Sequence, residues 1–274
     1  TIDIATSEEN NNLAKSGVGL FFGVIIYLFI FMYGVQVMKA VIEEKTNRIV
    51  EVLVSSIKPF QLMMGKIIGI MLVGLTQFSI WVLLIAISLT ALSIIAFPDM
   101  LDAANQAELM QNNVGGEVAM ENDFADLVFR QINWSLMIGL FIFYFIGGYL
   151  LYGSLMAAIG AAVDSETDTQ QFMIPVSMPL FFAYIIAINI TGNPNGSTAF
   201  WCSEIPFTSP IVMLVRVAIG GEGMIWQVLL SMSLLIVTFI FTTWIAAKIY
   251  RVGILMYGKK PSYKELLKWI RFKD

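Results

Sequence analysis

KAVIEEKTNRIVEVLVSSIKPFQLMMGK, residues 39–66, carries eight of the 36 charged residues of the chain and lies between two long apolar runs. The uncharged run on each side is long enough to cross a lipid bilayer. A charged segment held between two membrane spans is a place where a membrane protein can meet a soluble partner. We therefore expect the rest of the chain to hold this segment in place and to respond to it.

The composition indicates that lipid is the main solvent of the chain. Of the 274 residues, 58% are hydrophobic and 13% are charged, whereas soluble domains have about 45–50% apolar and about 25% charged residues. The mean hydropathy is +0.78. The sequence therefore predicts an all-α integral membrane protein.

Several kinds of chemistry are excluded. Histidine is absent and Cys202 is the only cysteine, so there is no Ser–His or Cys–His pair, no HExxH zinc site and no internal disulfide. Gly65–Lys66 and Gly258–Lys259 lack the earlier glycine and the following Ser or Thr of a P-loop. We expect no enzyme activity, no cofactor or metal in this chain and no nucleic-acid partner.

Five stretches qualify as transmembrane helices, at about 20 apolar residues per span. They cover residues 16–38, 67–97, 132–163, 170–191 and 224–247. The second and third are longer than one perpendicular span, so we expect them to tilt or to extend beyond the lipid. None has an Asp, Glu, Lys or Arg in its middle, which weighs against a proton- or sodium-coupled carrier.

The distribution of Lys and Arg predicts the orientation of the spans. With the C-terminus in the cytoplasm, the inner segments hold 13 Lys or Arg and the outer segments hold three. Segment 39–66 is then cytoplasmic, residues 1–15 form an external tail, and 98–131 form an acidic outer loop. A polar external tail without a signal peptide needs a preceding segment to carry it across the membrane. We therefore expect this chain to be the C-terminal part of a longer protein that has at least one further span.

Residues 206–221 predict a short element on the outer side. Their apolar core is 11 residues long and contains Arg216, so it cannot span the bilayer, and we interpret it as a re-entrant or interfacial helix. The expected landmarks are Pro206 before the helix, Ser209 as N-cap, Pro210 at the first helical position, Arg216 within the helix and Gly220 as its stop.

Small residues at four-residue spacing predict close packing between helices. The relevant positions are Gly65 and Gly69, and the stripe formed by Gly153, Ala157 and Ala161. Packing within the chain is the simpler interpretation, and a subunit interface is the alternative.

Within segment 39–66, Ile42, Thr46, Ile49 and Leu53 recur at helical spacing and predict one helix over about 39–56. Glu44–Arg48 and Arg48–Glu51 have the spacing of stabilising ion pairs on a helix. Such a helix could lie on lipid headgroups or dock on a protein, and its mixed charge favours docking. The second inner turn contains Asp164, Glu166 and Asp168 and is expected to be solvated rather than a contact.

Residues 252–274 predict a basic amphipathic tail in the cytoplasm. Ser262 and Glu265 have the spacing of a capping box, and Leu266, Leu267 and Ile270 form a short apolar side. Basic residues near the inner leaflet favour anionic lipid, so membrane lipids are the expected partner of the tail.

Three stretches resemble one family. EEKTNRIVEVLVSSIKPFQLMMGKIIG, residues 43–69, is similar to the coupling segment of ABC type-2 exporter permeases of the sodium-extrusion type. GSLMAAIGAAVDSETDTQQ, residues 153–171, resembles the third span and inner loop of that family, and IPFTSPIVMLVRVAIGG, residues 205–221, resembles its outer re-entrant element. The order and spacing match across nearly the whole chain.

The resemblance implies a permease domain over 16–251 that is part of a six-span unit, of which this chain lacks the first span. It implies a homodimer in the bacterial inner membrane that exports an ion, drug or lipid-like substrate with a separate ABC ATPase. The ATPase would dock on the 39–56 helix, with polar contacts from Glu43, Glu44, Lys45, Arg48 and Glu51, while Ile49 and Leu53 pack the helix. An ATP-independent channel or carrier and a membrane scaffold remain alternatives, and no residue pattern specifies the substrate.

Overall fold

A computed structural model describes residues 2–49, 56–96, 132–220, 224–256 and 262–271, without the side chains of residues 2–13, 89 and 92–96. The chain divides into two compact units. Unit 1 comprises residues 1–71 and 126–274, and unit 2 comprises residues 72–125. The predicted outer loop 98–131 lies outside the described residues.

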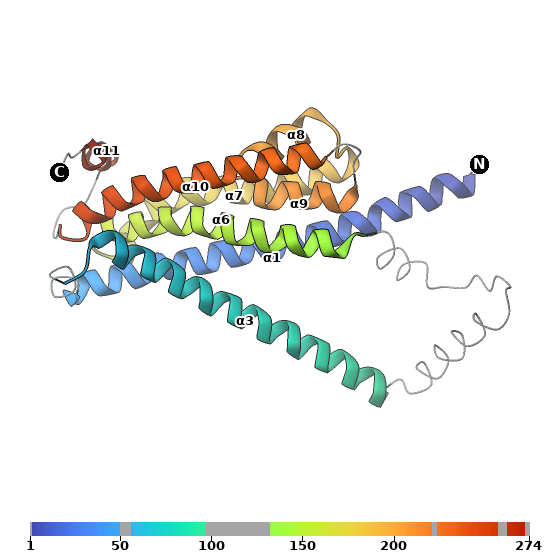
Figure 1. Ribbon diagram of the computed structural model, residues 1–274, viewed down its shortest axis with the longest axis horizontal. Coiled ribbons are helices and arrows are strands. Elements are labelled where there is room, and N and C mark those ends of the chain that lie inside the picture. The colour runs from blue at the N-terminus through green and yellow to red at the C-terminus, as the bar shows by residue number, and fades with distance from the viewer. Residues whose placement is uncertain (1, 50–55, 97–131, 221–223, 257–261, 272–274) are drawn as a thin grey trace. The chain divides into compact units, whose positions relative to one another are not determined.

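The described residues form helices and turns and contain no strand (Figure 1). The helices are α1 (Ile2–Thr46), α3 (Pro59–Ala96), α6 (Trp134–Ala162), α7 (Gln170–Asn189), α8 (Ser197–Glu204), α9 (Ser209–Ile219), α10 (Ile225–Gly253) and α11 (Tyr263–Arg271), with short 3-10 turns at Glu166–Thr169 and Ile190–Gly192. Five stretches are long and apolar enough to cross a membrane: Ala14–Thr46, Pro59–Ser88, Trp134–Ala162, Glu166–Gly192 and Ile225–Gly253. The all-α fold with five membrane-spanning helices is confirmed.

The spans continue as helix beyond their predicted ends. α1 has 45 residues, which corresponds to about 68 Å at about 1.5 Å per residue, whereas the hydrocarbon core of a bilayer is about 30 Å thick. α1 therefore does not end at Met38, and the charged residues that follow belong to the same helix.

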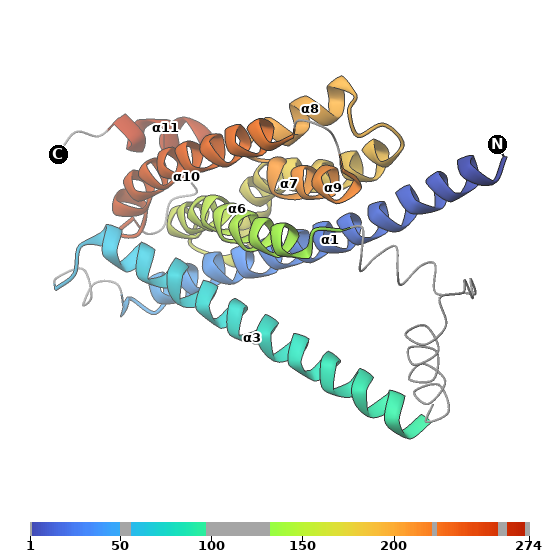
Figure 2. The same cartoon turned by 45° about the vertical axis from the view of Figure 1, so that its right-hand side comes forward.

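In unit 1, α6 packs against both α1 and α10 (Figures 1 and 2). Its first turn is capped by the side chain of Asn133, which accepts a hydrogen bond from the Leu136 amide at 3.1 Å. Gly153, Ala157 and Ala161 are buried; Gly153 lies against Ile67 of α3.

Close backbone approach occurs where the helices cross at glycine. A Cβ added at Gly160 of α6 would lie 2.6 Å from the Met38 carbonyl oxygen of α1. A Cβ at Gly19 of α1 would lie 2.9 Å from the Ala218 Cβ of α9. In contrast, no described atom lies within 4 Å of such a Cβ at Gly65 or Gly69, so these two glycines do not have the expected packing role within this chain.

The described part of the predicted outer element, residues 206–220, is a turn followed by the helix α9. α8 and α9 are joined by residues 205–208, and Pro206 lies in this turn. Ten of the eleven residues of α9 are buried, including Arg216, so α9 packs among the other helices of unit 1. The re-entrant or interfacial interpretation stays a prediction. Its N-cap is Thr208 rather than the predicted Ser209. Gly220, with φ 87°, ends the helix as predicted.

Pro210 fits the first turn of α9, because backbone N–H groups in the first turn have no partner within the helix and the N–H that proline lacks is not needed there. The ring also packs on α6, where a Cβ added at Gly148 would lie 3.0 Å from Pro210 Cγ.

The described part of unit 2 is the continuation of α3 from Leu72 to Ala96. Most of its described side chains are exposed and apolar, among them Trp81, Leu83 and Ile87. The hydroxyls of Thr76, Ser79 and Thr90 donate to carbonyls one turn earlier at 2.8–2.9 Å. An apolar surface whose polar groups are satisfied within the helix is typical of a lipid-facing span.

Candidate functional site at the basic end of unit 1

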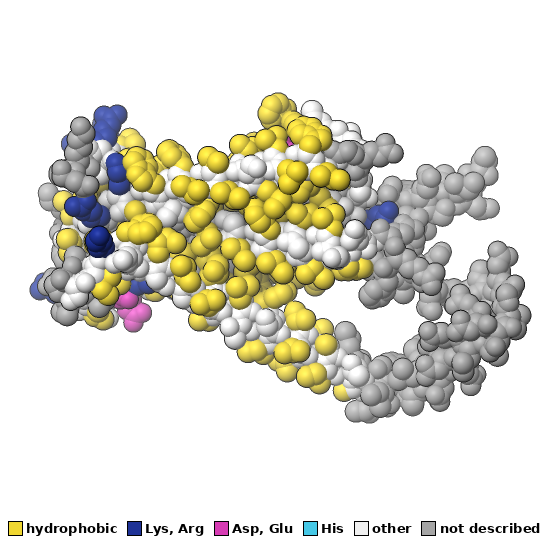
Figure 3. Space-filling view, in the orientation of Figure 1, with side chains coloured by type: hydrophobic (Ala, Val, Ile, Leu, Met, Phe, Trp, Pro, Cys, Tyr) yellow, Lys and Arg dark blue, Asp and Glu magenta, His cyan; other side chains and the backbone are white. Residues whose placement is uncertain are grey.

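Lys and Arg side chains gather at one end of unit 1, which we call the basic end (Figure 3). The end of α1, the start of α3, the end of α10 and the helix α11 lie at this end (Figure 1). The described Lys and Arg residues in or next to these elements are Lys39, Lys45, Arg48, Lys58, Lys66, Lys248, Arg251, Lys264, Lys268 and Arg271.

The predicted helix over 39–56 is interrupted. α1 ends at Thr46, where the Asn47 amide donates to Glu43 O and the Arg48 amide donates to Lys45 O, both at 3.0 Å. Arg48 has φ 56°, in the left-handed region that stops a helix. The predicted stripe is therefore not continuous: Ile42 lies in the core, Ile49 follows the turn, and Leu53 and Glu51 lie outside the described residues.

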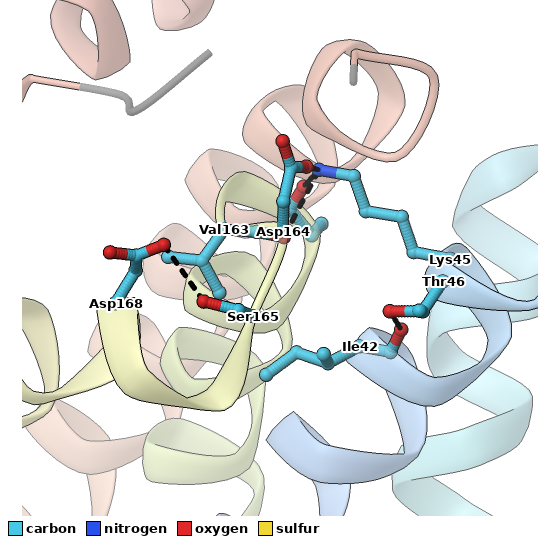
Figure 4. A network of polar contacts seen from close by, with 8 residues as sticks. Ile42, Lys45, Thr46, Val163, Asp164, Ser165 and Asp168 are labelled. Atoms are coloured by element: carbon cyan, nitrogen blue, oxygen red, sulfur yellow. Dashed lines mark hydrogen bonds and ion pairs between the residues drawn. The ribbon is translucent and has the colours of Figure 1, made fainter. Parts of the chain in front are cut away.

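Lys45 is buried inside unit 1, contrary to its predicted place on a docking surface. Its side chain is 1% exposed. Its Nζ donates to the carbonyl oxygens of Ala161 at 2.9 Å and Val163 at 3.1 Å, and it lies 2.8 Å from a carboxylate oxygen of Asp164 (Figure 4). The last carbonyls of a helix have no partner within the helix and attract a cation, so Lys45 caps the end of α6.

The expectation of a solvated second turn is wrong for Asp164, which pairs with Lys45. The remainder of the turn is stabilised locally, since Ser165 Oγ donates to Asp168 at 2.8 Å (Figure 4). Glu166 forms an ion pair with Lys39 at 3.2 Å, and both side chains are more than half exposed. Exposed pairs of this kind contribute about 0–1 kcal/mol.

A second lysine ties the start of α3 to α1. Lys66 Nζ donates to Ala40 O at 3.0 Å and forms an ion pair with Glu44. Glu44 therefore has a partner within the chain, and α1 ends before Arg48, so the helical spacing predicted for the Glu44–Arg48 pair does not extend to Arg48. The Tyr149 hydroxyl of α6 donates to Ile67 O of α3 at 2.9 Å.

We call the residues of these three contacts the three-helix clamp: Lys45 with Asp164, Lys66 with Glu44, and Tyr149 at the Ile67 carbonyl. The clamp joins the last turn of α1, the first turns of α3 and the body and end of α6. The end of α1 and the start of α3 are thus both bonded to neighbouring helices of unit 1.

The residues that can contact a partner are those around the turn. Glu43, Thr46, Asn47, Arg48 and Ile49 are exposed, whereas Glu44 is half-buried. Of the predicted docking residues, the structure therefore exposes Glu43, Arg48 and Ile49 and withdraws Lys45 into the clamp.

The tail packs beside this site. In α11 the predicted capping box is present, with the Ser262 amide donating to Glu265 Oε2 at 3.0 Å. Tyr263 donates to Gln171 O of α7 at 2.7 Å, and Lys248 of α10 donates to Ile270 O at 3.1 Å. The sequence analysis placed Leu267 on the apolar side, but Leu267 is exposed and Trp269 is the buried residue, lying against Gly253.

Outside the basic end, the notable polar group is buried Arg216. Its Nε donates to Pro194 O at 2.9 Å and its Nη1 donates to Ser203 Oγ. These bonds join α9 to α8 and to the turn before α8. Among the residues that the structure describes, no three His, Cys, Asp or Glu lie close enough to hold a metal ion.

Comparison with known proteins gives a consistent family. The model of a family described as "ABC-2 family transporter protein" matches residues 1–248. A Bacillus subtilis (strain 168) protein, "Uncharacterized protein YhaP", is 29% identical over 247 residues, which are 90% of this chain and 53% of that protein. A Methanocaldococcus jannaschii protein, "Uncharacterized protein MJ1024", is 27% identical over 247 residues, 90% of this chain and 52% of that protein. The chain thus spans about half the length of these relatives. No solved structure matches.

Proposed function

The chain belongs to the ABC-2 family of transporter proteins, and we propose that it is the permease part of an ATP-driven exporter whose ATPase docks at the basic end. The family and the five long apolar helices make it an integral membrane protein, and the family supports a transport role. ATP and Mg are bound by the separate ATPase in this proposal, because the chain has no P-loop.

The three-helix clamp is the observation that carries the proposal. A docked ATPase needs a surface on the permease and a connection from that surface into the membrane. Glu43, Arg48 and Ile49 supply an exposed surface of mixed charge. Lys45 attaches the end of α1 to α6, and Lys66 attaches the start of α3 to α1, so ATPase movement at this surface would displace the ends of these helices.

The basic end faces the cytoplasm in this proposal, because Lys and Arg accumulate on the cytoplasmic side of membrane proteins. α11 then lies at the inner leaflet with Lys264, Lys268 and Arg271 exposed toward anionic lipid headgroups. A second copy of the permease completes the transport unit, which we place in a bacterial inner membrane. The substrate is carried outward; its chemical class is not specified by any described site.

The docking surface is tested by charge reversal at its exposed residues. We expect Glu43→Lys with Arg48→Glu to abolish co-purification of the ATPase and ATP-stimulated export, because both side chains face outward at the turn. The matched control is Lys264→Glu with Lys268→Glu, which changes the same kind of exposed charge on α11 and should leave the ATPase bound.

Retained ATPase binding and export in the Glu43/Arg48 variant would refute docking at this turn. Transport in liposomes that contain the permease alone would instead identify an ATP-independent channel or carrier.

A further inference from the structure

A carboxyl group is buried without a hydrogen-bond partner at the end of unit 1 away from the basic end. Glu204, the last residue of α8, is 5% exposed. Neither of its two carboxyl oxygens has a hydrogen-bond partner among the residues that the structure describes. The mechanism proposed above does not use this group.

No described residue forms an ion pair with Glu204. Arg216 of α9 is near enough to act on it electrostatically, but Arg216 forms no ion pair with it and directs its N–H groups to Pro194 and Ser203. Tyr144 of α6 is the other titratable group within electrostatic reach. From α10, Ser231 donates to Ser203 O at 2.8 Å.

The described part of α7 adds no charged group. α7, which also packs against α8, contains no Asp, Glu, Lys or Arg. Glu222 lies outside the described residues. A buried carboxylate without a hydrogen-bond partner is strongly disfavoured, and such a group is neutralised by a proton. Burial raises the pKa of the Glu204 carboxyl above its ordinary value, and the Arg216 charge offsets only part of this effect.

We propose that Glu204 is a proton-binding site: its carboxyl holds a proton while buried, and release of that proton to water draws Arg216 away from Pro194 and Ser203 toward the new carboxylate. The bonds that Arg216 leaves are those that join α9 to α8 and to the turn at Pro194. Proton release therefore loosens this junction. The inference rests on the buried group alone and does not depend on ATPase docking.

The pH dependence has a definite sign. Because the native state binds the proton more tightly than the unfolded chain, Glu204 favours the native state at low pH. That contribution is lost as the pH rises from the ordinary carboxyl pKa through the raised pKa of Glu204. We expect Glu204→Gln, which keeps a neutral side chain of similar shape, to remove this component of the pH dependence of thermal unfolding.

The direct test uses N,N′-dicyclohexylcarbodiimide, an apolar reagent that reacts with protonated carboxyls. The purified protein in lipid nanodiscs is treated at neutral pH and the labelled peptide is identified by mass spectrometry. We expect label at Glu204, loss of that label in Glu204→Gln, and retention of it in the control Glu166→Gln, since Glu166 is an exposed glutamate. Raising the pH should decrease the labelling.

The labelling of the wild-type protein does not depend on whether a variant folds. Absence of label at Glu204, or labelling that stays constant as the pH is raised, would overturn the proposal. Protection from labelling by NaCl or KCl at constant pH would also overturn it, because the bound species would then be a metal cation.

Discussion

Replacing Lys45 by methionine removes the charged end of the three-helix clamp while keeping most of the side-chain volume. Two charge-assisted hydrogen bonds, to Ala161 O and Val163 O, and the ion pair with Asp164 are lost. Bonds to a charged group contribute about 1.5–3 kcal/mol each, and breaking a buried pair costs about 3–5 kcal/mol.

The structure places the expected cost toward the lower end of that range. The Asp164 side chain is 31% exposed, so its carboxylate can regain contact with water when Lys45 is absent. We therefore expect Lys45→Met to lower the free energy of unfolding by about 3 kcal/mol. The measurement is denaturant or thermal unfolding of the purified protein in detergent.

Lys39→Met is the matched control, because Lys39 lies on the same helix and its pair with Glu166 is exposed. That variant should cost no more than about 1 kcal/mol. A double-mutant cycle of Lys45→Met with Asp164→Asn should show a coupling of about 1–3 kcal/mol. Equal stabilities for the Lys45 and Lys39 variants would refute the assignment of Lys45 as the cap of α6.

Two further substitutions test the packing and the remaining link of the clamp. Gly160→Ala should destabilise the protein by about 1–3 kcal/mol, because the new Cβ would lie 2.6 Å from the Met38 carbonyl oxygen. Thermal unfolding of this variant is compared with that of Gly65→Ala, where the space around the new Cβ is open. Equal destabilisation in the two variants would contradict the prediction. Tyr149→Phe should lower the free energy of unfolding by about 0.5–1.5 kcal/mol, since the hydrogen bond to Ile67 O is lost. The variant should also reduce ATP-stimulated export. Unchanged stability and export would show that this bond is dispensable.

The fold class was predictable because the apolar runs are long and the charges lie between them. The helix ends were less predictable. Composition indicates where a helix leaves the lipid but not where its backbone stops being helical. For this reason the sequence did not predict that α1 extends beyond Met38 to Thr46. The end of α1 depends on the left-handed conformation of Arg48. An arginine, unlike a glycine, does not indicate such a conformation in the sequence.

Local patterns predicted the elements that depend on neighbouring residues. Gly220 ends α9 as expected, and Ser262 and Glu265 form the capping box. Both features involve residues within one turn of each other, so spacing alone is sufficient to identify them.

The clamp was missed because its partners are far apart in the sequence. Lys45 and Asp164 are separated by 119 positions, and helical spacing pairs a residue only with those three or four positions away. One signal was available: the end of α6 needs a cation for its carbonyls, and Lys45 and Lys66 lie at the same end of the molecule as that turn. The exposed-charge interpretation of Lys45 failed because charge pattern does not reveal burial.

Docking of an ATPase at the turn after α1 can be measured by site-specific photo-crosslinking. A photoreactive residue at Ile49, which is 45% exposed beside that turn, should form an adduct with the co-expressed ABC ATPase. The same residue at Ile225, which is 79% exposed at the start of α10, should form none. An adduct from Ile225 but not from Ile49, in a complex that still exports in response to ATP, would contradict the proposal.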